Sequence, residues 1–272
     1  MVTFANAKIN IGLQVLNRRD DGYHNLETVF YPLKIYDVLE VVEAAETRFV
    51  PSGLPIPGDS HDNLCLKTYH LLRAAYDLPP VTIYLHKTIP IGAGLGGGSA
   101  DAAFLLKLLN STFGLGLEEP QLITYARQLG ADCAFFIRNT PVLATGIGDV
   151  FEDVNVDLSA YQLVLVKPNV HVSTGEAYGT VIPNPEGKQL ASAITRPVET
   201  WRDTIANDFE PGIFAAHPEI RALKMLLYEK GAVFAAMSGS GSAVYGLFNE
   251  SVRLQELSSS CDVLYVDLSK AG

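Results

Sequence analysis

Apolar and polar residues alternate near the start of the chain. From residue 8 to residue 15 every second position is apolar, namely Ile9, Ile11, Leu13 and Val15. Because successive side chains of a β-strand point to opposite faces, this spacing predicts a strand with one apolar and one polar face. Lys8 and Asn10 then lie on the same polar face. Apolar patterns at residues 81–85 and 161–168 predict two further strands.

Helical spacing is found in three segments of the first half. Apolar residues recur on one face between residues 64 and 75, after an Asp-Asn pair at 62–63 that can cap a helix. Residues 99–109 are apolar nearly all round, which predicts a helix buried at the centre of its domain. A third helix is expected from about residue 118 to residue 129, with Pro120 in its first turn and Gly130 after its end.

The second half begins again with an apolar strand, after a polar connector at residues 153–159. Helical patterns follow near residues 201–209 and 218–230, and strands are expected at 232–237, 243–248 and 261–268. We therefore expect one domain over residues 1–155 and a second over residues 160–272. Because strands and helices mix without a strict βαβ rhythm, both domains are expected to be α+β.

The composition is typical of a soluble globular protein, with 48% hydrophobic and 18% charged residues. No apolar run approaches the ~20 residues of a membrane helix, and the first residues lack the features of a signal peptide, so we expect a cytoplasmic protein. A formal net charge of −10 without clustered Lys and Arg argues against nucleic acid as a partner. The widely spaced Cys65, Cys133 and Cys261 are expected to be reduced core residues, without a disulfide or zinc site.

A glycine-rich loop precedes the predicted buried helix. Five of the nine residues from Ile91 to Ser99 are glycine. Backbone N–H groups of such a loop can converge on phosphate oxygens, where any Cβ would prevent close approach, and the helix start adds partial positive charge. Ser99 is placed to cap the helix and to offer its hydroxyl to a phosphate or to its Mg²⁺. The pattern predicts a phosphate-binding site.

Other glycine-loop types fit less well. No lysine stands between Gly98 and Ser99, which excludes a Walker A loop. Residues 92–97 do match GxGxxG, but Pro90 interrupts the direct strand-to-loop path of a dinucleotide fingerprint. The HRD and DFG triplets of protein kinases are absent. A nicotinamide-dependent oxidoreductase, a nucleotide-binding module without catalysis and a merely structural glycine turn remain as alternatives.

Three segments resemble, in order, the three motifs of the GHMP kinases, which are named for galactose, homoserine, mevalonate and phosphomevalonate. They are AKINIGLQV at 7–15, IPIGAGLGGGSADAA at 89–103 and MSGSGSAVYGLF at 237–248. The resemblance implies an ATP-dependent kinase of small alcohols. It also implies an N-terminal domain similar to the second domain of ribosomal protein S5, a ferredoxin-like C-terminal domain and an active site in the cleft between them.

Two more segments narrow the resemblance within the family. DGYHNLETVF at 21–30 and GADCAFF at 130–136 are most similar to members that phosphorylate the 2-hydroxyl of a cytidine-diphosphate derivative of methylerythritol, a step toward isoprenoid precursors. A kinase for another small alcohol, such as mevalonate or homoserine, is the alternative.

The resemblance assigns the catalytic pair to Lys8 and Asp132. Taken from the residues alone, a solvated lysine on a strand face is the commoner explanation for Lys8. A helix-cap role for Asp132 is as common as a catalytic one. The departure from the family pattern is Ala100-Asp101, where related kinases often have a small polar pair. The implied nucleotide-binding residues are Asn63, Leu64, Pro90, Ile91, Gly92, Ala93, Gly94, Leu95, Gly96, Gly97, Gly98, Ser99 and Ala100. Mg²⁺ is expected to accompany ATP, and its protein ligands stay open.

The substrate-binding residues implied by the resemblance are Asn10, Tyr23, His24, Tyr178, Gly239 and Gly241. A histidine can hydrogen-bond a cytosine edge, and a tyrosine can cover its face. The alternative is a turn at Asp21-Gly22 followed by two partly buried rings. Likewise, the two second-domain glycines either approach the ligand or shape a hairpin between two strands.

Overall fold

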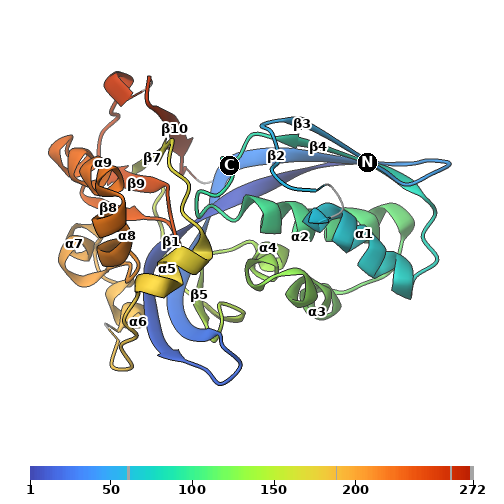
Figure 1. The fold of residues 1–272 in the computed structure, drawn as a ribbon, viewed down its shortest axis with the longest axis horizontal. Coiled ribbons are helices and arrows are strands. Elements are labelled where there is room, and N and C mark those ends of the chain that lie inside the picture. The colour runs from blue at the N-terminus through green and yellow to red at the C-terminus, as the bar shows by residue number, and fades with distance from the viewer. Residues whose placement is uncertain (60–61, 188, 258, 270–272) are drawn as a thin grey trace. The chain divides into compact units, whose positions relative to one another are not determined.

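The computed structural model describes residues 1–59, 62–187, 189–257 and 259–269 and divides the chain into two compact units (Figure 1). The first unit contains residues 1–7, 35–91 and 96–140, and the second contains residues 8–34, 92–95 and 141 onward. The units are therefore not two successive stretches of chain. A boundary between consecutive domains near residues 155–160 stays a prediction.

Two long strands contribute to both units. They are β1 (Val2–Arg18) and β2 (His24–Glu43), which pair with each other. All residues of β1 from Ala5 to Val15 are buried, including the polar Lys8, Asn10 and Gln14. The predicted alternation holds, but the polar face is covered, so the alternative of a solvated Lys8 is wrong.

The first unit places helices on a small sheet. The second part of β2 pairs antiparallel with β4 (Val81–Lys87), and β4 pairs parallel with β3 (Arg48–Gly53). The helices are α1 (Leu64–Ala75), α2 (Gly97–Phe113), α3 (Glu119–Leu129) and α4 (Phe135–Arg138), with a 3₁₀ turn at Ala131–Cys133. Figure 1 shows α1 and α2 along one face of these strands. Helix α2 contacts the other three helices and is buried on most sides, which confirms the predicted central helix.

The second unit has two strand groups. The first part of β2 pairs with β5 (Val142–Thr145), which pairs with β6 (Val150–Asp153). A separate antiparallel sheet has the order β10-β7-β9-β8, from Cys261–Asp267, Gln162–Pro168, Val244–Phe248 and Phe234–Met237. The helices are α5 (Thr174–Thr180), α6 (Leu190–Ala193), α7 (Trp201–Thr204), α8 (Glu210–Ala216) and α9 (Pro218–Glu229), with 3₁₀ turns at Val198–Thr200 and Gln255–Leu257. The mixture of helices and antiparallel strands confirms the α+β class.

The sequence patterns predicted some helix boundaries correctly and others wrongly. The Asn63 side chain accepts the Cys65 N–H at 2.8 Å, which confirms the predicted cap of α1. The cap of α2 is Gly96, with a φ of +70°, so the idea that Ser99 caps this helix is wrong and Ser99 lies in its first turn. The helix expected over residues 201–209 ends at Thr204, because Ala206 and Asp208 form backbone hydrogen bonds with Leu13 of β1 instead.

Candidate functional site

Lys8 lies buried inside the second unit, with 3% of its surface exposed. Its ammonium group donates to the Gly94 carbonyl oxygen at 3.0 Å and to the Asn10 side-chain oxygen, and it lies 5.1 Å from the centre of the Phe30 ring. Its backbone N–H donates to the Leu95 carbonyl at 2.9 Å. Strand β1 and the glycine loop are thus joined at this lysine.

The second glycine segment packs on the first. The Ser238 hydroxyl donates to the Gly94 carbonyl at 2.8 Å and accepts the Asn10 N–H at 3.2 Å. A Cβ on Gly94 would lie 1.9 Å from the Ser238 carbonyl oxygen, and Gly94 has a φ of +74°. Only glycine fits there, because a side chain would push the two segments apart.

Gly239 and Gly241 lie in the six-residue connection between β8 and β9, which pair antiparallel, so the predicted hairpin is confirmed. A Cβ on Gly239 would lie 3.1 Å from the Asn10 side-chain oxygen. Asn10 itself donates to the Thr28 hydroxyl at 2.9 Å and is buried. The structure therefore brings Lys8, Asn10, Gly94 and Gly239 together within one unit.

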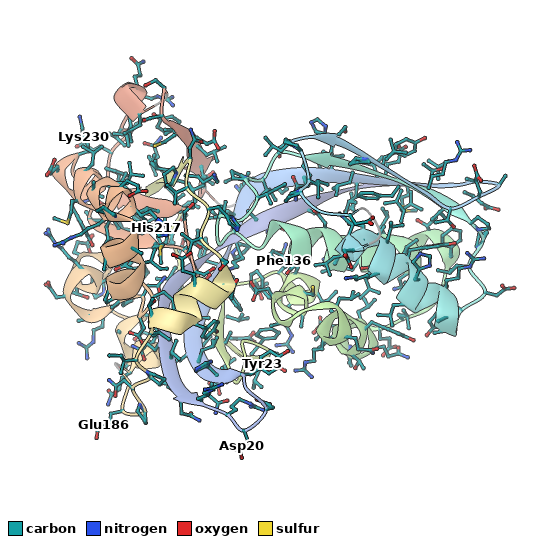
Figure 2. All side chains as sticks on the ribbon, viewed as in Figure 1. Asp20, Tyr23, Phe136, Glu186, His217 and Lys230 are labelled. Carbon is teal, nitrogen blue, oxygen red and sulfur yellow. The ribbon has the colours of Figure 1, made fainter. Side chains whose placement is uncertain are left out.

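A second cluster of the same unit is aromatic. The His24 and Tyr178 rings stack with centroids 4.9 Å apart and planes at 21°. Phe209 packs edge-on against Tyr178, with ring centroids 4.9 Å apart. The turn expected at Asp21-Gly22 is present. Tyr23, labelled in Figure 2, is 63% exposed beside that turn. Two of the three predicted aromatic residues are thus paired, and Tyr23 is accessible.

The rest of the glycine loop belongs to the first unit, where it starts α2. No side chain among the described residues caps this helix, and Gly98 in its first turn is exposed. The 17-residue helix therefore begins without a side-chain cap, and the N–H groups at such a helix start can bind an anion. Leu64 lies beside this turn, since a Cβ on Gly98 would be 3.9 Å from its Cδ1 atom.

Asp132 lies in the same unit as this helix start. It is half-buried in the 3₁₀ turn before α4, and it caps neither that turn nor α4, so the helix-cap alternative is wrong. Its neighbour Cys133 is buried, which raises the pKa of the thiol to about 12, although a hydrogen bond with Ser99 opposes the shift. Cys133 therefore stays a neutral thiol beside the two predicted residues.

A buried charged cluster, which the sequence did not reveal, supports the start of the loop. Lys87, at the end of β4, donates to Asp37 and, at 2.8 Å, to Asp101 of α2. The other Asp37 oxygen accepts the N–H groups of Thr88 at 2.6 Å and Ile89 at 2.9 Å. Burial raises the pKa of Asp101 to about 8, against the opposing effect of Lys87. Asp101, the departure from the family pattern, thus ties α2 to the entrance of the loop.

The comparisons with known proteins agree with these motifs. Residues 63–140 match the model of the GHMP kinases N terminal domain, and residues 190–261 match that of the GHMP kinases C terminal domain. The chain belongs to the GHMP kinase family. It is 52% identical over 261 residues to the 4-diphosphocytidyl-2-C-methyl-D-erythritol kinase of Bacteroides fragilis, covering 94% of this chain and 95% of that protein.

Solved structures of GHMP kinases have the same fold. A crystal structure of 4-(cytidine 5'-diphospho)-2C-methyl-D-erythritol kinase matches the whole of both chains with a TM-score of 0.82 and 28% identity. The mevalonate kinase of Methanococcus jannaschii matches 99% of this chain and 98% of its own with a TM-score of 0.74 and 13% identity. The second likeness concerns the fold alone.

GHMP kinases use ATP, which is consistent with a glycine loop at a helix start. The loop is not part of a dinucleotide-binding βαβ unit, because α2 is followed by α3 and β4 pairs antiparallel with β2. Lys8 belongs to the second unit and Asp132 to the first, so their pairing stays a prediction. The nucleotide and substrate roles of the individual residues stay predictions as well.

Proposed function

We propose that this GHMP kinase phosphorylates the 2-hydroxyl of 4-diphosphocytidyl-2-C-methyl-D-erythritol with ATP. The observation that carries the proposal is about half identity, along nearly the full length of both proteins, to relatives with this named activity. The stacked pair of His24 and Tyr178 supports it, because a flat, partly exposed aromatic surface with a histidine edge suits a cytosine base.

The reaction is a direct phosphoryl transfer. The 2-hydroxyl oxygen forms a bond to the γ-phosphorus while the bond between this phosphorus and the β,γ-bridging oxygen breaks, giving the 2-phosphate and ADP. The hydroxyl proton passes to Asp132. Such transfers depend mainly on alignment and on stabilisation of charge, so a carboxylate that orients the hydroxyl and accepts its proton late is sufficient.

The proposed role of Lys8 is to present its charge toward the transferring phosphoryl group. The Gly94 carbonyl and the Asn10 side chain fix the position of its ammonium group, and Gly94 belongs to the predicted phosphate loop. The start of α2, with Ser99 in its first turn, offers N–H groups to the phosphates. Roles in nucleotide binding for the remaining loop residues, Asn63 and Leu64 belong to the same proposal.

Magnesium enters this proposal as part of the MgATP substrate. Within the described residues, no three His, Cys, Asp or Glu side chains gather to hold a metal ion. Mg²⁺ typically keeps several waters and binds substrate phosphates together with one or two protein oxygens, and the Ser99 hydroxyl is a candidate for such a ligand.

No helix among the described residues is long and apolar enough to cross a membrane. A cytoplasmic enzyme acting on a free small molecule, without nucleic acid, is also part of the proposal.

The test is coupled ADP release with a panel of acceptors. We expect turnover with 4-diphosphocytidyl-2-C-methyl-D-erythritol and at least about 100-fold lower kcat/KM with mevalonate or homoserine, because these acceptors lack the cytosine base whose contacts with the enzyme would favour the cytidine substrate. A higher kcat/KM with mevalonate or homoserine would reassign the substrate within the family. ATP binding without ADP release for any acceptor would mean a module without catalysis.

A further inference from the structure

The segment between α7 and α8 runs along the strand that carries Lys8. Leu13 of β1 donates its N–H to the Ala206 carbonyl at 3.0 Å and accepts the Asp208 N–H at 2.8 Å. One Asp208 carboxylate oxygen accepts the Val15 N–H at 2.9 Å. Asn207 is therefore held in a fixed place relative to β1, inside the second unit.

Asn207 is buried, and its carboxamide contacts only the backbone in the hydrogen bonds described. Its NH₂ group donates to the carbonyls of Met237 at 2.9 Å and Gly239 at 2.7 Å, while its oxygen accepts the Phe209 N–H at 3.0 Å. Both donor hydrogens of the amide are thus used by the connection between β8 and β9. An aspartate would have the same shape but no hydrogen to donate.

Glu210 holds the same connection from a second point. One carboxylate oxygen accepts the Met237 N–H at 2.9 Å, and the other accepts from Lys224 at 2.6 Å. Met237 is therefore fixed through both its N–H and its carbonyl. Because Asn207 and Glu210 lie in one short turn, they act on the connection as a single rigid support.

The supported connection contacts the surroundings of Lys8 directly. Between the two carbonyls held by Asn207 lies Ser238, whose hydroxyl donates to the Gly94 carbonyl and accepts the Asn10 N–H. That carbonyl also accepts from the Lys8 ammonium, and Gly94 has no free space toward Ser238. A shift of Ser238 must therefore move the acceptor of Lys8.

We propose that Asn207 is a positioning residue that fixes the Lys8 ammonium group through Ser238 and Gly94. The inference rests on the proposed function, because it takes Lys8 as the lysine that serves phosphoryl transfer. Asn207 touches neither substrate in this account. It sets the place of the Gly94 carbonyl, so its loss displaces one of the two acceptors described for the Lys8 ammonium group.

The test compares Asn207→Asp with wild type in steady-state kinetics and in crystal structures. The variant removes both donors without opening a cavity. We expect kcat to fall about 10- to 100-fold, as for a misplacement near 1 Å, with the KM for ATP changed less than about threefold. We also expect the Lys8 to Gly94 distance to exceed hydrogen-bonding range in the variant crystal.

Ser238→Ala provides a second variant that removes one small oxygen and should fold readily. We expect a similar loss of kcat, and a double variant no worse than the poorer single variant, because both act on one chain of contacts. The matched control is Asn110→Ala, which removes two amide contacts to the Leu117 backbone at the far end of α2. This control should lower thermal stability and leave kcat unchanged.

Normal kcat and an intact Lys8 contact in Asn207→Asp would overturn the inference, as would strictly additive losses in the double variant. If Asn207→Asp does not fold, Ser238→Ala decides alone by the same two readouts. If wild type phosphorylates no acceptor, the proposed function fails. The Lys8 to Gly94 distance in the variant crystals then still decides whether Asn207 positions the lysine.

Discussion

Among the described residues two lysines are buried, Lys87 in the first unit and Lys8 in the second, and their surroundings differ. Lys87 contacts two carboxylates, Asp37 and Asp101, which raise its pKa even though burial opposes this. The hydrogen bonds described for Lys8 lead to a backbone carbonyl and a side-chain amide, in the glycine loop and in β1. The first arrangement joins a strand to a helix, whereas the second joins a loop to a predicted catalytic strand. Burial of a lysine alone therefore does not identify a functional site.

The largest effect on stability is expected for Lys87→Met. This change leaves Asp37 and Asp101 buried without their cation, which typically costs about 3 to 5 kcal/mol of unfolding free energy, and protonation of Asp101 would lower the cost. Urea unfolding measures it. The control is Arg48→Met, which breaks a fully exposed ion pair with Glu46 and should change nothing measurable. Equal stability of the two variants would contradict the role given to Lys87.

Gly94→Ala disturbs the Lys8 side of the comparison. The added Cβ would overlap the Ser238 carbonyl, so the Gly94 acceptor must move, and we expect kcat to fall about 100-fold. Gly116→Ala is the control, since Gly116 also has a positive φ, of +68°, but open space around it. The two variants are compared by steady-state kinetics on preparations that contain the same fraction of folded protein. A larger loss of kcat in the Gly116 variant would show that backbone strain, and not the contact with Ser238, is responsible.

At the Lys87 site, the contribution of Asp101 to the stability of the folded state is expected to depend on pH. Because the pKa of Asp101 is raised to about 8, the folded state binds more protons than the unfolded state between about pH 4 and pH 8. This group's contribution to stability is therefore fully present below about pH 4 and is lost as pH rises toward 8. Urea midpoints at several pH values should show a smaller fall for Asp101→Asn than for wild type. If the urea midpoint depended on pH equally in Asp101→Asn and in wild type, the proton taken up on folding would reside on a group other than Asp101.

The smallest effect is expected at the aromatic pair. Loss of the stacking ring in His24→Ala should raise the KM for the cytidine substrate about 3- to 10-fold, equivalent to an aromatic contact of about 0.5 to 1.5 kcal/mol. Turnover at saturation should stay within about twofold. His86→Ala, which removes an exposed histidine of the first unit, is the control and should leave both constants unchanged. A fall in kcat without a change in KM would contradict a role in base recognition.

Much of the fold could be predicted because its signals are local. The cap of α1, the apolar run of α2 and the strands around the second glycine segment all lie within short windows of sequence. The burial of both faces of β1 was not predictable, since alternation gives the faces of a strand but not what covers them. The helix expected over residues 201–209 was wrong beyond Thr204, because pairing with β1 overrides the local pattern there.

The missed residues of the site share one property, namely that their partners are distant in sequence. Asn207 binds carbonyls about 30 residues away, and Lys87 binds Asp37 across 50 residues. Contacts between residues so far apart produce no periodicity or fixed spacing that could be recognised in the sequence. Lys8 was found only through the resemblance of its motif, since a lysine on an alternating strand is more often solvated.

The most direct test of the account is a rapid-quench single turnover with Lys8→Met, with ATP affinity measured on the same preparation. The account places phosphoryl transfer beside the Lys8 and Gly94 contact, so we expect transfer to the cytidine substrate at least about 100-fold slower than in wild type, with an ATP Kd within about threefold. Transfer at close to the wild-type rate by the folded variant would contradict it.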